Sequence, residues 1–296
     1  MVSDSGAAAV TEKIRLAGVV GCGVMGSGIA EVCARAGLEV RVAVRSDASI
    51  ASGRTRLLRS LDHALGKGKI TAADHDRAFE SVSFGTSLAH LANCQIIFEA
   101  IPEHEPSKLS LFAELDKIAA DTRVIFASNT SSIPIIRLAK ATDHPERVIG
   151  THFFSPVPAL PLTELIGSLL TDPDTYERTE SFITETLGKQ VIRSSDRAGF
   201  IVNAMLIPYL ISAIRMVESG FAEADVIDKG MTLGCSHPVG PLKLADLIGL
   251  DTIASAATAL YEEHKELQYS PPPLLLRMVD GGLLGKKAGR GFYRYA

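Results

Sequence analysis

The chain has 296 residues, a formal net charge of −4 and four cysteines. This length can form two domains with a sizeable core, and the charge gives no general attraction to nucleic acid or to an anionic membrane. The cysteines lack CxxC pairs and zinc-ligand spacing, which predicts a reducing, cytoplasmic location and no metal site.

Two segments bear on targeting and on membranes. We expect residues 1–12, MVSDSGAAAVTE, to be a disordered leader, because they lack the basic and apolar regions of a signal peptide. The longest apolar run, residues 200–217, is interrupted by polar side chains and by Pro208. It is therefore predicted to be a buried helix, kinked at Pro208, and not a membrane span.

The first predicted strand and helix flank a glycine-rich turn. An apolar strand over residues 14–20 precedes the turn, and a helix of small residues, 27–36, follows it. The turn consists of Gly21, Cys22, Gly23, Val24, Met25 and Gly26. Gly21 permits the bend, Gly23 lets backbone approach a phosphate, and Gly26 lets the helix pack closely on the strand. The free N–H groups of the helix then face an anion, so this motif predicts a dinucleotide-binding site.

The second predicted strand, residues 39–44, ends without the acid typical of NAD-binding folds. In those folds an Asp or Glu at this position binds the ribose hydroxyls. Here the position is Val44, followed by Arg45 and Ser46. Arg45 can bind a 2′-phosphate and Ser46 can donate one more hydrogen bond, so we predict NADP as the cofactor, with NAD as the alternative. In that alternative, Arg45 is a solvated loop residue and Asp47 binds the ribose.

Strand-like and helix-like segments continue to alternate as far as residue 193. Further strands are expected over residues 95–100, 123–127, 148–151, 162–166 and 190–193. Helices are expected over residues 49–67, 71–80, 106–119 and 173–187. This alternation predicts an α/β domain with a doubly wound, mostly parallel Rossmann-type sheet.

The strand signal disappears after Gly199. Helices are expected over residues 200–219, 222–233, 240–260 and 273–281. We therefore predict a dinucleotide-binding domain over residues 1–194 and a smaller all-α domain over residues 195–296. Apolar helix faces in a domain of this size are commonly buried against a second copy, so we expect a homodimer formed through it.

Three segments carry candidate catalytic side chains. A loop between two strands can bring His152 and Glu164 together, so that Glu164 holds one ring nitrogen while the other exchanges a proton with substrate. Alternatively, His152 is a structural histidine. Residues 128–132, SNTSS, follow a strand at its carboxyl end, where open α/β sheets bind ligands, or they cap the helix near Ile135. The amide of Asn203 contacts either the substrate or the core.

Seven motifs in this order and spacing resemble the 3-hydroxyacyl-CoA dehydrogenase family, specifically the short bacterial 3-hydroxybutyryl-CoA dehydrogenases. They are VVGCGVMGSGIAEVCARAG, FEAIPE, ASNTSSI, HFFSPVP, GFIVNAMLIPYL, HPVGPLKLADLIGLD and GKKAGRGFY. The resemblance extends over residues 19–295. It implies hydride transfer between a nicotinamide cofactor and C3 of a short-chain acyl-CoA, that is, (S)-3-hydroxybutyryl-CoA dehydrogenase or acetoacetyl-CoA reductase activity.

The resemblance also implies roles for individual residues. His152 matches the general acid/base and Glu164 the residue that orients it, while Ser131 and Asn203 match the side chains at the reacting oxygen. Residues that match cofactor contacts are Glu103, Lys108, Ser155 and Lys287. Residues that match contacts to the CoA nucleotide are Ser60 and Lys67, two helical turns apart on one face.

Two departures from the family pattern leave alternatives open. The family motif HFFNPVP reads HFFSPVP here, so the shorter Ser155 replaces an asparagine, and Pro161 stands where many members have a basic residue. One alternative is a dehydrogenase that acts on a carrier-protein thioester or a free hydroxy acid. Another is a non-catalytic dinucleotide-binding protein on the same scaffold.

Overall fold

The computed structural model describes residues 13–119, 121 and 123–295, so the leader expected at residues 1–12 lies outside the described residues. The chain divides into two compact units between Asp196 and Arg197. Within the described residues, no single helix has the length and apolar character needed to cross a membrane. One pair of helices, Pro241–Ile248 and Leu250–His264, passes that test together but is bent by 96°.

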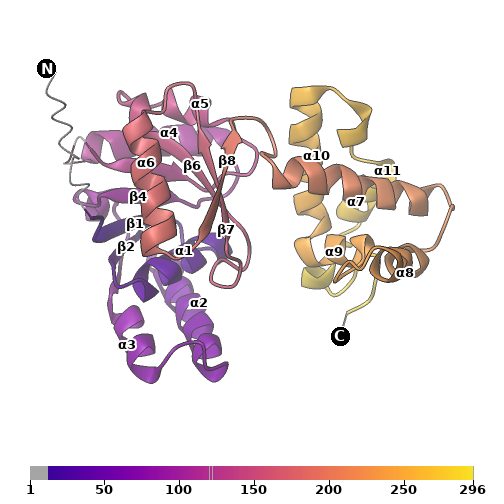
Figure 1. Cartoon of the computed structure of the whole chain (residues 1–296), viewed down its shortest axis with the longest axis horizontal. Coiled ribbons are helices and arrows are strands. Elements are labelled where there is room, and N and C mark those ends of the chain that lie inside the picture. The colour runs from indigo at the N-terminus through magenta and orange to yellow at the C-terminus, as the bar shows by residue number, and fades with distance from the viewer. Residues whose placement is uncertain (1–12, 120, 122, 296) are drawn as a thin grey trace, which may run out of the picture. The chain divides into compact units, whose positions relative to one another are not determined.

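The first unit is built on a single sheet with the strand order β3-β2-β1-β4-β5-β6-β7-β8 (Figure 1). The strands are β1 (Leu16–Val20), β2 (Glu39–Ala43), β3 (Val82–Gly85), β4 (Ile96–Glu99), β5 (Ile125–Ser128), β6 (Val148–Phe153), β7 (Leu162–Gly167) and β8 (Gln190–Ser195). Neighbouring strands are parallel except for β6 and β7, which are antiparallel. The strand order reverses between β1 and β4, and such a switch point is where open α/β sheets bind ligands.

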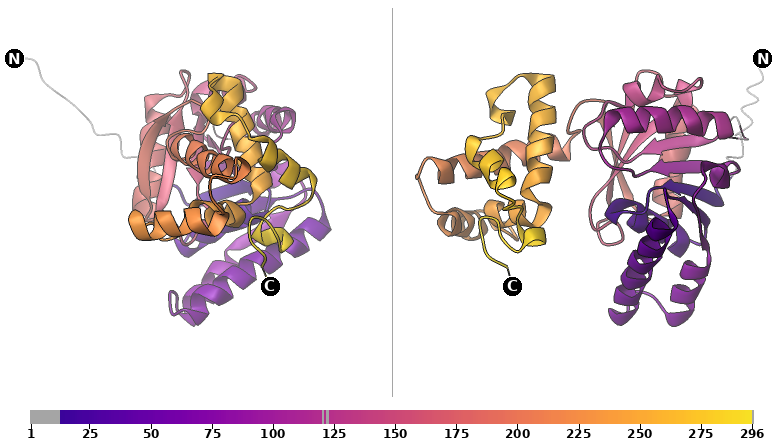
Figure 2. Two further views of the ribbon diagram at one scale, coloured as in Figure 1. Left: turned by 90° about the vertical axis from the view of Figure 1, so that its right-hand side faces the viewer. Right: turned by 180° about the vertical axis from the view of Figure 1, so that it is seen from behind.

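Helices cover both faces of this sheet. They are α1 (Val24–Arg35), α2 (Asp47–Gly66), α3 (Ala72–Glu80), α4 (Glu105–Ile118), α5 (Ile135–Ala139) and α6 (Pro173–Ser181). Helix α6 lies on one face and α4 on the other (Figures 1 and 2). Helices α2 and α3 form a hairpin that connects β2 to β3 (Figure 1). The predicted Rossmann-type α/β architecture is thereby confirmed.

Local capping and packing explain where these helices begin. Ser46 caps α2, and Thr71 caps α3 through a reciprocal capping box with Asp74. Helix α1 starts inside the glycine-rich turn and is buried from Gly26 to Ala34, as its small residues allow. In the core, the ring of Phe98 on β4 packs edge to face against that of Phe153 on β6, with 5.8 Å between the ring centroids.

Three elements of the first unit differ from the sequence prediction. Strand β3 was not predicted, because it has only four residues, including Ser83 and Gly85, and pairs on one side with β2. The helix expected over residues 173–187 is α6 followed by a π-helical turn, Phe182–Thr186. Strand β6 continues to Phe153, so His152 lies within the strand and not after it.

The second unit is all-helical in its described residues, as expected. Its helices are α7 (Val202–Glu218), α8 (Ala224–Gly234), α9 (Pro241–Ile248), α10 (Leu250–His264) and α11 (Pro273–Asp280). The single helix predicted over residues 240–260 is wrong, because Gly249 adopts φ 106° and separates α9 from α10. The C-terminal tail is fixed by the buried Asp246, whose carboxylate accepts hydrogen bonds from the backbone of Phe292 and Tyr293.

Candidate active site

A cavity of about 1080 Å³ opens at the switch point of the sheet. Its lining comes mainly from residues 20–25 at the end of β1 and beyond it, 43–45 at the end of β2 and beyond it, and 100–102 after β4, with further side chains from α2 and α4. The carboxyl ends of three parallel strands therefore meet around it. Its volume is slightly above the usual range for ligand pockets, so it has room for an extended ligand such as a dinucleotide.

The glycines of the turn fit this cofactor for different reasons. A Cβ on Gly21, which has φ +89°, would lie 2.8 Å from the Ala100 carbonyl oxygen, and one on Gly26 would lie 2.0 Å from the Gly21 oxygen. The fold itself therefore needs these two glycines. A Cβ on Gly23 would meet nothing within 4 Å, and Gly23 lines the cavity. A side chain there would occupy space that a phosphate group needs, so the turn fits a dinucleotide.

The segment after β2 is arranged differently from the sequence prediction. Val44 and Arg45 line the cavity. Ser46 does not line it, and the Ser46 hydroxyl accepts a hydrogen bond from the Ser49 amide as the cap of α2. Asp47, the alternative ribose ligand, is also absent from the lining. The predicted phosphate contact of Ser46 stays a prediction. In this structure its hydroxyl forms the N-cap hydrogen bond of α2.

His152 and Glu164 lie directly opposite each other on the antiparallel strands β6 and β7. Directly paired residues on such strands project from the same face, so the strand register alone brings the two side chains together. The distance between His152 Nδ1 and Glu164 Oε2 is 2.6 Å, and the Glu164 side chain is fully buried. The ring of His152 also contacts that of Phe154, 4.6 Å away. Strand pairing holds the imidazole, and no loop is needed to form the pair.

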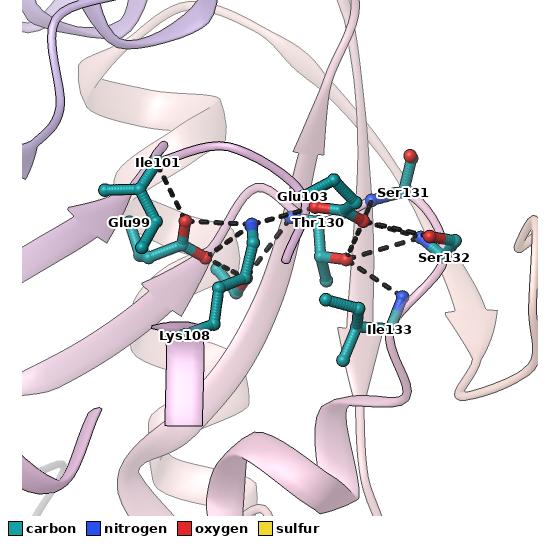
Figure 3. Close-up of polar contacts among 9 residues, drawn as sticks. Glu99, Ile101, Glu103, Lys108, Thr130, Ser131, Ser132 and Ile133 are labelled. Atoms are coloured by element: carbon teal, nitrogen blue, oxygen red, sulfur yellow. Dashed lines mark hydrogen bonds and ion pairs between the residues drawn. The ribbon is translucent and has the colours of Figure 1, made fainter. Parts of the chain in front are cut away.

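The loop after β5, which carries Ser131, is tied to Glu103 (Figure 3). The backbone amides of Ser131 and Ser132 and the hydroxyls of Thr130 and Ser132 all donate to Glu103 Oε1. The same loop is joined to β6, because the Phe153 amide donates to Asn129 Oδ1 at 3.0 Å. Ser131 is thus fixed by two anchors, one of them beside His152 in the chain.

A buried ammonium group, that of Lys108, forms an ion pair with Glu103. Lys108 on α4 is 1% exposed, and its Nζ lies 2.9 Å from Glu103 Oε2 and 2.8 Å from Glu99 Oε1 (Figure 3). Burial acts to raise the pKa of Glu103, but the Lys108 charge and the hydrogen bonds of the Ser131 loop outweigh it and lower that pKa. The cofactor contacts predicted for Glu103 and Lys108 stay predictions, and the structure adds a shared positioning network.

The other predicted site residues belong to other segments of the chain. Ser155 follows β6 and is exposed, and Ser60 on α2 is half-buried, with Lys67 exposed just beyond the end of that helix. In the second unit, Asn203 is half-buried in the first turn of α7. Lys287 forms an ion pair with Asp251, with Nζ 2.6 Å from Oδ2.

Several polar residues of the site were missed by the sequence analysis. Glu99 ends the apolar strand β4 and is fully buried; a carboxylate in such a strand needs a partner, and this signal could have identified it. Ser49, Ser52 and Arg56 line the cavity from α2. Their only sequence signal is a spacing that places them along one face of the helix.

Comparisons with known proteins agree with this geometry. Residues 16–197 match the NAD binding domain of 3-hydroxyacyl-CoA dehydrogenase, and residues 199–295 match its C-terminal domain. A 3-hydroxybutyryl-CoA dehydrogenase from Mycobacterium tuberculosis is 54% identical, over 97% of this chain and all of the relative.

Two solved structures have the same fold. The crystal structure of M. tuberculosis FadB2 superimposes with a TM-score of 0.95 at 55% identity, over 96% of this chain and all of that one. That of (S)-3-hydroxybutyryl-CoA dehydrogenase PaaH1 from Ralstonia eutropha gives 0.90 at 42% identity, with the same two coverages. The chain belongs to the 3-hydroxyacyl-CoA dehydrogenase family, and it is an oxidoreductase that uses a nicotinamide dinucleotide to act on a CH–OH group.

Proposed function

We propose that the protein is an NADP(H)-dependent (S)-3-hydroxybutyryl-CoA dehydrogenase that works mainly as an acetoacetyl-CoA reductase. The observation that carries the chemistry is the buried hydrogen bond of 2.6 Å between His152 Nδ1 and Glu164 Oε2. An imidazole held by a carboxylate is suited to exchange a proton with a substrate oxygen. The four-carbon acyl group is inferred from the relatives, which are named for 3-hydroxybutyryl-CoA.

In this mechanism the nicotinamide, when bound, supplies or accepts a hydride at C3 of the acyl group. His152 gives a proton to the C3 oxygen during reduction and removes it during oxidation, through Nε2. Glu164 keeps Nδ1 protonated and stabilises the imidazolium form. Ser131, held by its loop, donates a hydrogen bond to the same oxygen. We also propose a substrate contact for Asn203, on the basis of its match to the family asparagine.

Support for NADP(H) comes from the cavity after β2. A carboxylate at position 44 would repel a 2′-phosphate, and the residue there is Val44. Arg45 follows and lines the cavity, and its guanidinium can bind a phosphate through two hydrogen bonds. We propose that NADPH binds with its 2′-phosphate against Arg45.

The helical unit supports the proposal of a homodimer. Several large apolar side chains on it are exposed, among them Met205, Phe221 and Leu233, each at least 74%. Removing such side chains from water is favourable, so a partner that buries them gains free energy. We propose that this partner is a second copy of the chain, and that Ser60 and Lys67 contact the CoA nucleotide on the first unit. Multi-angle light scattering at micromolar concentration should give twice the chain mass of 31.5 kDa.

The test is acetoacetyl-CoA reduction followed at 340 nm with NADPH and NADH side by side. We expect kcat/KM to be at least about tenfold higher with NADPH, which corresponds to about 1.4 kcal/mol. Faster reaction with NADH would refute the proposed preference for NADPH, while the proposed reaction would still stand. No reaction with either cofactor would refute the assignment of acetoacetyl-CoA as the substrate. The same assay with a free 3-hydroxy acid or a carrier-protein thioester would then identify the alternative substrate.

A further inference from the structure

Three residues of α2 line the cofactor cavity from one side of the helix. Ser49, Ser52 and Arg56 are spaced i, i+3 and i+7, which places them on one face. Gly53 allows this face to approach the glycine-rich turn, because a Cβ there would lie 2.8 Å from Cys22 Sγ. Helix α2 therefore packs directly against the glycine-rich turn, and it does so at residues that follow its first helical turn.

Arg56 is held in this position by two hydrogen bonds from one nitrogen. Its Nη1 donates to the Cys22 carbonyl oxygen at 3.0 Å and to Ser52 Oγ at 2.8 Å. Among the residues that the structure describes, neither Arg56 nor Arg45 forms an ion pair with a carboxylate. Nη2 and Nε of Arg56 therefore keep their donor capacity for a ligand.

The charge of this part of the cavity is positive. Arg45 and Arg56 both line it, and among the described residues the one carboxylate in the lining, Glu114, belongs to α4. Two guanidiniums beside hydroxyl groups make a site for a phosphate monoester, which carries close to two negative charges and several acceptor oxygens. A ribose hydroxyl is uncharged and gives neither guanidinium an ionic partner.

We propose that Arg56 is a second specificity-determining residue, which together with Arg45 binds the 2′-phosphate of NADP(H). The inference rests on the proposed NADP(H) preference and extends it to a residue on the third turn of α2. Arg56 lies on the helix that follows β2, and it lines the same cavity as Val44 and Arg45. Ser49 and Ser52 add two hydroxyl groups of α2 to this site, besides the contact predicted from the sequence for Ser46.

The experiment compares binding of intact cofactors and of adenosine fragments, so that it does not depend on turnover. Isothermal titration calorimetry on the full chain gives Kd values for NADPH and NADH, and for adenosine 2′,5′-bisphosphate and AMP. The variants are Arg56→Gln and, as a matched control, Arg59→Gln, which removes the same charge from an exposed position of α2 outside the cavity lining.

We expect Arg56→Gln to weaken NADPH and the bisphosphate by about tenfold or more, since a hydrogen bond to a charged group contributes about 1.5–3 kcal/mol. NADH and AMP should bind within about twofold of the wild type, and Arg59→Gln should leave all four Kd values within that range. Arg56→Lys should restore part of the loss, because it keeps the charge without the planar fork.

The outcomes separate the inference from the proposal on which it rests. Equal weakening of NADPH and NADH by Arg56→Gln overturns the inference and assigns Arg56 to the shape of the turn or to the pyrophosphate. An unchanged preference for NADPH in Arg56→Gln also overturns it, while the proposed function stands. A wild-type protein that binds NADH as tightly as NADPH overturns the cofactor preference and this inference together.

Discussion

Replacing Glu164 by glutamine removes the negative charge beside His152 and keeps the size of the side chain. The Gln Oε1 can still accept the hydrogen bond from Nδ1–H that the carboxylate accepts at 2.6 Å. The orientation of the imidazole should therefore be kept. Because Glu164 is fully buried, a neutral amide is also less costly to bury than the carboxylate, and the fold should tolerate the change.

The size of the effect follows from the geometry. At an effective dielectric constant of about 20, opposite unit charges roughly 4 Å apart attract by about 4 kcal/mol. A neutral hydrogen bond, which remains in the variant, contributes about 1 kcal/mol. The net loss of about 3 kcal/mol applies to the imidazolium that forms as His152 takes the substrate proton. It corresponds to a decrease of roughly 10²-fold in kcat for oxidation.

The assay is oxidation of (S)-3-hydroxybutyryl-CoA with NADP+ at pH 7, with wild type, Glu164→Gln and Glu164→Ala compared. Glu164→Ala loses the orienting hydrogen bond as well and should be slower than Glu164→Gln. Cofactor Kd and thermal unfolding serve as controls and should change little in Glu164→Gln. A kcat within about threefold of the wild type, at saturating substrate, would refute the assignment of Glu164 to the stabilisation of the imidazolium.

Gly23→Ala should leave the unfolding temperature unchanged but weaken cofactor binding, whereas Gly26→Ala, whose Cβ would lie 2.0 Å from a backbone oxygen, should lower the unfolding temperature; calorimetry of both variants tests this contrast. Lys108→Met leaves two carboxylates without their buried cation and should cost about 3–5 kcal/mol in urea unfolding, against less than about 0.5 kcal/mol for the exposed Lys140→Met. The lowered pKa of Glu103 means that its stabilising contribution is present above its unfolded pKa of about 4.3 and is lost as pH falls through the folded value. The difference in unfolding free energy between wild type and Glu103→Gln should therefore be constant near neutral pH and shrink in acid, and a difference that is independent of pH down to about 3 contradicts this reasoning.

The fold class could be predicted because its signals are local. An apolar strand, a glycine-rich turn and a helix of small residues stand in sequence order, and strand β1 and helix α1 lie where that pattern indicates. Strand β3 could not be found this way, because a four-residue segment with Ser83 and Gly85 becomes a strand only by pairing with β2. Gly249 gave a weak signal, since an isolated glycine can also occur within a helix.

The candidate site required more than local patterns. The pairing of His152 with Glu164 was expected from a loop, whereas the two residues are direct partners in the β6–β7 register. Register depends on how the whole strands align, and one sequence does not specify it residue by residue. The same holds for Lys108: its position in the chain does not show that Glu99 and Glu103 lie on either side of its ammonium group.

The 2′-phosphate site illustrates why neighbours in sequence are an incomplete guide to specificity. A serine just before a helix satisfies a backbone donor first, so the Ser46 hydroxyl caps α2. Arg56 lies on the third turn of α2, and it reaches the cavity because Gly53 lets that helix pack on Cys22. A cofactor preference read only from the residues that follow β2 would thus identify Arg45 and overlook half of the positive charge. A change of the cofactor preference from NADPH to NADH should then require substitutions at both arginines, since Arg45→Gln alone leaves one guanidinium in the cavity.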